Sequence, residues 1–345
     1  MKKRLFLALA LGLVLVAGLL LWVGQRKPAE EPVELLSYGN VVMGAEKHFY
    51  SQSEIENLNI GNPWYPGGIV RTLPIYHSSS LDKPGTEQAL AAKQALRSLG
   101  IWESLQKPDH FQFHYRFSNG SLSARTTGYT ISFNEKPFSL PWYLPDDTDG
   151  ENTFSQLKEL GNYLGCKFSI KLGMERPIAC FAYSRDGYNN QISTYAGKNS
   201  LRDRIVSYHF DRIDYRISEY GSGFHISRIS PQWMKKVGDY PIISLDQAQT
   251  MLENGVFLHD FLYTFRSAEL FPKEPAPSRE EVVYTTLLYD TNHYNVTLPF
   301  YLFYAPSQFE SKTGETLYRV YYVPAIDLSY IENPEIFGPG FEKKP

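Results

Sequence analysis

Cysteine is scarce in this chain, because only Cys166 and Cys180 occur among its 345 residues. Two thiols without a nearby histidine do not make the four-ligand set of a structural zinc site, so no such site is expected. The sequence also lacks a glycine-rich phosphate loop with a following lysine, and Ser222 lacks the glycine spacing of a hydrolase nucleophile. We therefore predict no cofactor, no metal and no enzymatic activity.

Two other motifs resemble metal sites but fail on spacing. His110 and His114 would share one face of a helix, but their segment alternates as a strand, which separates them by about 13 Å. The acidic run 146–151 resembles a calcium loop, but Pro145 stands at the first position, which needs an acidic or amide ligand, and Gln156 stands at the twelfth, which needs glutamate. Both segments are predicted to be structural.

A basic surface is lacking outside the N-terminus. Five basic residues are the only charges in the first 27 positions, which leaves 29 basic and 37 acidic side chains and a net charge of −8 for the remainder. Nucleic-acid binding needs a basic face that neutralises phosphates. The body of the protein is therefore not expected to bind nucleic acid.

One long hydrophobic run is present at residues 5–23, where 19 positions carry no charge. As a helix it spans about 28 Å, close to the thickness of a membrane core. The basic residues before it predict a cytoplasmic N-terminus, and Trp22 suits the far interface. A cleaved signal peptide is the alternative, although the run is long and Trp-Val-Gly-Gln-Arg-Lys is a poor cleavage site. Both interpretations place residues 28–345 outside the cytoplasm, either as part of a single-pass membrane protein or as a chain released by cleavage.

The rest of the chain alternates between helical and strand patterns. Helices are expected at 86–99, 153–165 and 244–255, and each is followed by aromatic-rich strand segments. We predict an α+β fold in which an N-terminal transmembrane helix precedes two or three units of one helix on antiparallel sheet. The expected divisions are 1–27 (cytoplasmic tip and anchor), 28–34 (spacer), 35–145 (first unit, with an irregular Pro/Gly-rich entry), 146–235 (second unit), 236–335 (C-terminal unit) and 336–345 (tail).

The helix at 244–255 has the clearest local signals. Ser244 and Gln247 have the spacing of a capping box, and Gly255 suits the position just beyond the helix end. Its expected apolar stripe consists of Leu245, Ala248, Met251 and Leu252. The stripe predicts a helix that covers a sheet.

Several segments are predicted as strands. Residues 111–117 alternate strictly, and Asn119-Gly120 predicts a tight hairpin turn after them. Residues 204–217 are also expected to be a strand, on which His209, Asp211 and Asp214 form a solvated face or inter-strand ion pairs rather than a catalytic triad.

The two cysteines flank a predicted hairpin. A turn centred on Gly173 would place Cys166 opposite Cys180, at a Cα separation within or at the edge of disulfide reach. The alternative is a facing pair of buried, reduced thiols. A disulfide between Cys166 and Cys180 is accordingly one of two open predictions.

The last strands are rich in tyrosine. The strand 298–304 is expected to face the strand 316–326, and together they carry Tyr301, Tyr304, Tyr318, Tyr321 and Tyr322. One interpretation is an aromatic cross-strand ladder in the core. The other is a partner or ligand surface, because tyrosine is enriched at interfaces.

The order of anchor, capped helix, "VVYTTLLYD", "LPFYLFY" and "YRVYYVPAI" resembles membrane-anchored extracytoplasmic proteins of Gram-positive (Firmicute) bacteria. It is more remotely similar to PepSY-type domains and to the YycH/YycI accessory proteins of a cell-wall-sensing histidine kinase. The similarity covers mostly residues 236–330. It implies a regulatory or interaction protein of the cell envelope that contacts another membrane protein, such as a sensor kinase. A sensor ectodomain for a peptide or wall fragment is the alternative, and an envelope enzyme is the third.

Overall fold

A computed structural model of the chain describes thirteen ranges of residues and gives an α+β fold with antiparallel sheets and few helices. The ranges are 35–36, 49–52, 55–56, 61–77, 85–101, 104–107, 113–134, 162–182, 190–217, 223–259, 275–291, 296–310 and 314–337. The predicted α+β class is confirmed for this part of the chain.

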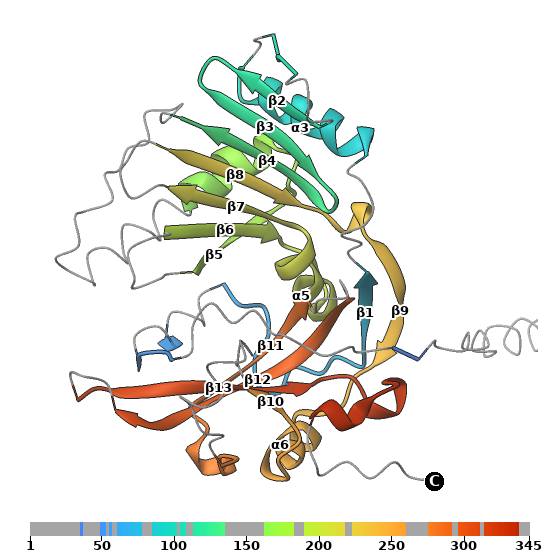
Figure 1. Ribbon diagram of the computed structural model, residues 1–345, viewed down its shortest axis with the longest axis vertical. Helices are drawn as coiled ribbons and strands as arrows, with labels where there is room; N and C mark the ends of the chain where they lie inside the picture. Colours follow the sequence, from blue (N-terminus) through green and yellow to red (C-terminus); the bar gives the residue numbers. More distant parts are fainter. Residues whose placement is uncertain are drawn as a thin grey trace, which may run out of the picture. The chain divides into compact units, whose positions relative to one another are not determined.

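One sheet has seven antiparallel strands in the order β2-β3-β4-β8-β7-β6-β5 (Figure 1). Its strands are β2 (His114–Phe117), β3 (Gly120–Arg125), β4 (Gly128–Phe133), β5 (Pro177–Ala182), β6 (Asn190–Ala196), β7 (Arg212–Ile217) and β8 (Phe224–Ile229). The predicted hairpin is confirmed, but its two turn residues are Ser118 and Asn119 rather than Asn119 and Gly120, because Phe117 pairs with Gly120 across the turn. Strands from the predicted units 35–145 and 146–235 share this sheet, since β4 pairs with β8.

The other sheet has six strands. Five of them follow the order β10-β13-β12-β1-β9, and the sixth, β11, also pairs with β12. Its strands are β1 (Thr72–His77), β9 (Lys235–Pro241), β10 (Leu258–His259), β11 (Tyr284–Thr291), β12 (Val296–Glu310) and β13 (Thr316–Pro324). The expected pairing of the last strands is confirmed, because Phe303 lies opposite Tyr321. The strand β1 comes from the irregular Pro/Gly-rich entry, and it pairs with β9 and β12, which lie far from it in the sequence.

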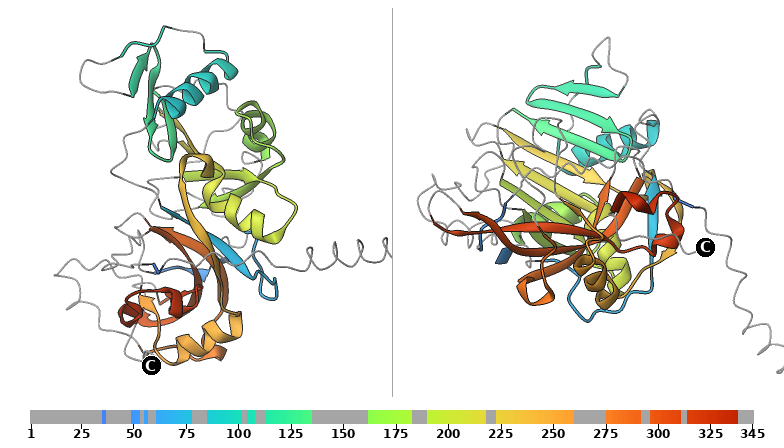
Figure 2. Two further views of the ribbon diagram at one scale, coloured as in Figure 1. Left: turned by 90° about the vertical axis from the view of Figure 1, so that its right-hand side faces the viewer. Right: turned by 60° about the horizontal axis from the view of Figure 1, so that its bottom comes forward.

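The helices of the described ranges pack on or beside these sheets. They are α3 (Thr86–Ser98), α5 (Leu201–Phe210), α6 (Leu245–Glu253), the π-helical η1 (Leu164–Ser169), and the 3₁₀ turns η2 (Pro231–Trp233), η3 (Arg279–Glu281), η4 (Leu328–Tyr330) and η5 (Pro334–Phe337). Figure 2 shows α3 and η1 on the same side of the seven-stranded sheet. Both helices contribute to one hydrophobic core with that sheet face.

The capped helix α6 forms as predicted. The Ser244 amide donates to Gln247 Oε1 at 2.8 Å, and the Gln247 amide donates to Ser244 Oγ at 3.2 Å. Gly255 has φ +75, the left-handed conformation that glycine adopts at lowest cost. Ala248 and Leu252 are buried against the six-stranded sheet, whereas Leu245 and Met251 are partly buried.

The helix α3 is confirmed, and small side chains make up most of its buried side. Ala95 and Leu96 are buried, whereas Leu90 is 54% exposed. The buried side is completed by Gln88, Ala89 and Ala92. Ala92, Ala95 and Leu96 therefore pack in the core with the sheet, and Leu90 does not.

The predicted hairpin around Gly173 is wrong. Cys166 lies in the helical segment η1, and the strand that carries Cys180, β5, pairs with β6 instead. Phe168 is buried while Ile170 is 55% exposed, so the segment follows a helical rather than a two-residue period. The cysteine side chains are not among those that the structure describes, so their disulfide stays a prediction.

The predicted strand 204–217 is also wrong in its first half. Residues 201–210 form the helix α5, which begins where the Asp203 amide donates to Ser200 Oγ at 3.0 Å. His209 therefore lies on a helix, and only Asp214 lies on the strand β7. The missed signal was Ser200 three residues before Asp203, a helix-start pattern.

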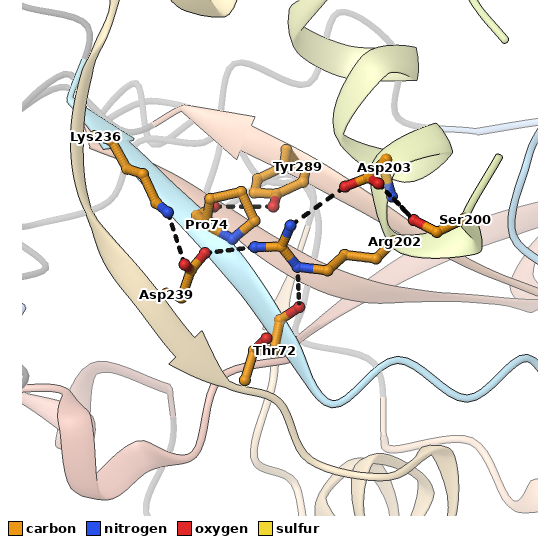
Figure 3. A network of polar contacts seen from close by, with 8 residues as sticks. All are labelled: Thr72, Pro74, Ser200, Arg202, Asp203, Lys236, Asp239 and Tyr289. Atoms are coloured by element: carbon orange, nitrogen blue, oxygen red, sulfur yellow. Dashed lines mark hydrogen bonds and ion pairs between the residues drawn. The ribbon is translucent and has the colours of Figure 1, made fainter. Parts of the chain in front are cut away.

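Arg202 of α5 joins the two sheets through a polar network (Figure 3). Its Nε donates to the Thr72 carbonyl of β1 at 3.1 Å, and its Nη2 lies 2.5 Å from Asp239 Oδ1 of β9. Lys236 Nζ contacts the other oxygen of Asp239 at 2.6 Å. Because α5 lies between β6 and β7 in the chain, this network ties the seven-stranded sheet to the six-stranded one.

None of the helices in the described part of the chain is long and apolar enough to cross a membrane. The predicted anchor 5–23, the spacer 28–34, His110 and the acidic run 146–151 lie outside the described residues. Those predictions are not tested by the fold.

Candidate functional site

A cavity of about 600 Å³ lies on the face of the seven-stranded sheet that α3 and η1 cover. Its walls come from α3, the loop after η1, the strands β4, β6 and β8, and the turn η2. A volume of this size falls within the range of small-molecule sites. The cavity is therefore the candidate functional site.

Small side chains leave the space open. Ala91 and Ala95 stand one helical turn apart on α3, and both line the cavity together with Gly173 and Ala196. The helix is held over the sheet by Gln88, whose Nε2 donates to the Thr126 carbonyl at 3.0 Å. The fold thus fixes a helix with a shallow face above the strands.

The opposite wall is held by buried hydroxyl groups. Ser169 Oγ lies 2.5 Å from Thr194 Oγ1 and 2.7 Å from the Tyr215 hydroxyl, so η1 is bonded to β6 and β7. The loop that follows turns through Gly173 and Arg176, which have φ +85 and +46. A non-glycine residue at positive φ is uncommon, and such residues occur more often near functional sites.

An ion pair and two aromatic rings line the interior. Arg228 Nη2 lies 2.5 Å from Asp211 Oδ1, and both side chains are largely buried, at 13% and 17% exposed. The Tyr129 and Trp233 rings meet edge-to-face at 6.2 Å. Burial raises the pKa of Tyr129 to about 12, with Arg228 opposing the shift, so its hydroxyl stays protonated at neutral pH.

Charged residues stand at exposed positions of the lining. Lys171 and Lys198 are exposed cations, and Glu175 is an exposed anion. With the internal ion pair neutral overall, these side chains give the lining one net positive charge. The arrangement suits an amphipathic ligand with a carboxylate, because the alanines and Trp233 offer apolar contact while the lysines offer cations.

The described residues contain no candidate metal centre. Within those ranges, no group of three or more His, Cys, Asp or Glu side chains is placed to hold a metal ion. His225 Nδ1 lies 2.9 Å from Ser132 Oγ on the other face of the sheet, away from the cavity. The Ser132–His225 pair is therefore not part of the candidate site.

The predicted tyrosine surface lies in the core instead. Tyr301, Tyr304, Tyr321 and Tyr322 are 1–7% exposed, and Tyr318 is partly exposed. The Tyr301 hydroxyl donates to the Ile243 carbonyl at 2.9 Å, and its ring meets Trp64 edge-to-face. This placement corrects the idea of an exposed partner groove and favours the cross-strand ladder, because buried rings cannot contact a partner.

Comparison with known proteins adds no assignment. The chain matches no protein-family model, no curated protein and no solved structure. The resemblance to PepSY-type and YycH/YycI proteins accordingly stays a prediction, and the site is interpreted from its own residues.

One residue of this site could be recognised from the residue pattern of its strand. In β8, Phe224, Ile226 and Arg228 occupy alternate positions, so an arginine stands in the apolar phase of the strand. A charge at an inward position marks either an ion pair or a site. Asp211 and Trp233 carry no such pattern, because their placement depends on tertiary contacts between segments distant in the chain.

Proposed function

We propose that this protein is a membrane-anchored, extracytoplasmic, non-enzymatic regulatory protein of the cell envelope that binds a small amphipathic ligand between α3 and the seven-stranded sheet. The observation that supports it is the cavity with Arg228, Asp211, Tyr129 and Trp233 inside and lysines on its exposed lining. A peptide or wall fragment has the matching chemistry, since it combines carboxylates with apolar groups.

The anchor is the part of the proposal that concerns location. Residues 5–23 hold the chain in the membrane with residues 1–4 in the cytoplasm, and the units of helix on antiparallel sheet lie outside. Membrane fractionation with N-terminal sequencing tests it. We expect the intact chain in the membrane fraction, and a soluble chain that starts after residue 24 would contradict the anchor.

A cavity-filling variant tests the binding site. Ala91→Leu adds apolar atoms into the cavity, while leucine and alanine have similar helix propensities. We expect the free energy of unfolding to change by less than about 1 kcal/mol, because the new atoms enter open space rather than a packed core. A mixture of muropeptides from digested peptidoglycan should raise the melting temperature of the wild-type protein but not of this variant.

Arg97→Leu is the matched control, because Arg97 lies on the same helix, is exposed and does not line the cavity. Its melting temperature should rise with muropeptides as the wild type does. If muropeptides raised the melting temperature of Ala91→Leu as much as that of the wild type, the ligand would bind outside the cavity.

Regulation through contact with another membrane protein, such as a sensor kinase, is the second candidate. It is favoured by the polar face of the same sheet opposite the cavity, where Arg116 and Arg125 are exposed. Ligand binding and partner contact are compatible, because the cavity and that face lie on opposite sides of the strands.

A further inference from the structure

One buried hydroxyl faces the cavity without a hydrogen bond from the described part of the chain. Tyr129 of β4 lines the cavity and is 4% exposed. No described residue donates or accepts a hydrogen bond at its hydroxyl, and the oxygen is not fully enclosed, so it can be reached from the cavity. By contrast, the Tyr289 hydroxyl donates to the Pro74 carbonyl and the Tyr301 hydroxyl to the Ile243 carbonyl, each at 2.9 Å. Buried polar groups normally have a partner, and the cavity is where a partner for the Tyr129 hydroxyl can enter.

The charges beside this hydroxyl balance each other. Register pairing places Tyr129 directly opposite Arg228 of β8. Arg228 Nη2 donates to Asp211 Oδ1 at 2.5 Å, and Arg228 Nη1 donates to the Ile229 carbonyl at 3.0 Å. Because Asp211 already neutralises the guanidinium, a ligand carboxylate placed here would be a buried charge without a counter-ion, which is strongly unfavourable. A neutral carbonyl oxygen can accept the Tyr129 hydrogen without that cost.

The unbalanced cations lie at the exposed part of the lining. Lys171 and Lys198 are exposed, and within the described ranges neither lysine belongs to an ion pair. Glu175 is the exposed anion of the same lining. A carboxylate bound by these lysines keeps much of its hydration, so it does not pay the cost of burial. The lining thus separates a neutral hydrogen-bond donor inside from cations at its exposed edge.

We propose that Tyr129 determines the specificity of the cavity by donating its hydroxyl hydrogen to an amide carbonyl of the ligand, while the ligand's carboxylate stays at Lys171 and Lys198. The ligand class is therefore an N-acylated amino acid or short peptide that enters with its acyl end first and its carboxylate outermost. The inference rests on the proposed function, because it takes the cavity as the binding site. It adds the group that is recognised and the orientation in which the ligand binds.

The test measures equilibrium retention of muropeptides by the full-length protein in detergent, before and after their carboxyl groups are converted to amides. Tyr129→Phe should retain about tenfold less of both mixtures, because it loses one hydrogen bond to the ligand. Its melting temperature without ligand should stay within about 2 °C of the wild type, since the fold loses no hydrogen bond that the described residues make. The double variant Lys171→Gln, Lys198→Gln should retain about fivefold less of the free-acid mixture and as much of the amidated one as the wild type.

Tyr301→Phe is the matched control, because it removes a hydroxyl that is bonded inside the six-stranded sheet. It should lower the melting temperature but retain muropeptides within about twofold of the wild type. A melting temperature of Tyr129→Phe as low as that of Tyr301→Phe would overturn the proposal, since the hydroxyl would then stabilise the fold. An effect of Tyr129→Phe that amidation abolishes would also overturn it, because the carboxylate would then lie at Tyr129.

Failure of this inference is distinct from failure of the proposed function. If the wild type retained no muropeptide, both would be overturned. If retention were lost in Ala91→Leu but unchanged in Tyr129→Phe, the cavity would remain the binding site and only the role of Tyr129 would be overturned.

Discussion

Replacing Tyr301 with alanine is expected to destabilise the protein by about 3–5 kcal/mol, the usual cost of deleting a buried aromatic ring. Tyr301 is 4% exposed, packs against Trp64 and donates to the Ile243 carbonyl. Tyr301→Phe should cost about 1–3 kcal/mol, because it keeps the ring but leaves that buried carbonyl without its donor. Urea denaturation of the full-length protein in detergent measures both changes.

An exposed tyrosine provides the matched control. Tyr65 is 56% exposed, so Tyr65→Ala should change the free energy of unfolding by no more than about 0.5 kcal/mol. If Tyr301→Ala were as mild as Tyr65→Ala, the tyrosine-rich strands would not form the core described above. The sequence interpretation of an exposed tyrosine surface would then regain its support.

Acidification is expected to destabilise the protein through His209. Burial lowers the pKa of His209 from 6.5 to about 3, and Arg212 adds to the shift. Between these values the unfolded chain binds one proton more than the native chain, so stability falls as the pH falls. The slope is at most about 1.4 kcal/mol per pH unit, and the loss between pH 6.5 and 5 is about 2 kcal/mol.

His209→Phe isolates this effect. The ring contacts Phe210 and Tyr289, so phenylalanine keeps an aromatic ring there but cannot titrate. Urea denaturation at pH 7.5, 6.5 and 5 should show a shallower pH dependence in the variant than in the wild type. An unchanged slope would mean that other groups, such as His225 with its pKa also lowered by burial, account for the acid sensitivity.

Local chemistry explains which elements were predictable from the sequence. The helix α6 has its cap residues within a dozen positions, and each cap bond forms between neighbours in the chain. The β2–β3 hairpin is likewise indicated by Asn119-Gly120, although its turn lies one residue earlier, at Ser118 and Asn119. Such elements could be predicted because their stabilising contacts are short in sequence separation.

The errors occurred where two periods fit the same residues. Phe168, Ile170 and Leu172 alternate as a strand would, but only Phe168 is buried and Ile170 is exposed, as in a helix. In α5, charged residues stand among apolar ones as they do in a strand, although Ser200 and Asp203 have the spacing of a helix start. Tertiary packing decides such cases, and no local pattern displays it.

The cavity depends on strand register and could not be predicted from the order of residues along the chain. Arg228 meets Asp211 because β8 pairs with β7. Non-local strand pairing therefore creates the candidate site.

The most direct test of the account is equilibrium binding of the muropeptide mixture to the full-length protein in detergent, with mass spectrometry of everything recovered. The account predicts that the wild type retains a subset of muropeptides at about one per chain, with unchanged masses, and that Ala91→Leu retains at least about tenfold less. Equal retention by both proteins would contradict the cavity as the site. Recovery of cleaved or modified muropeptides would contradict a binding protein that performs no chemistry.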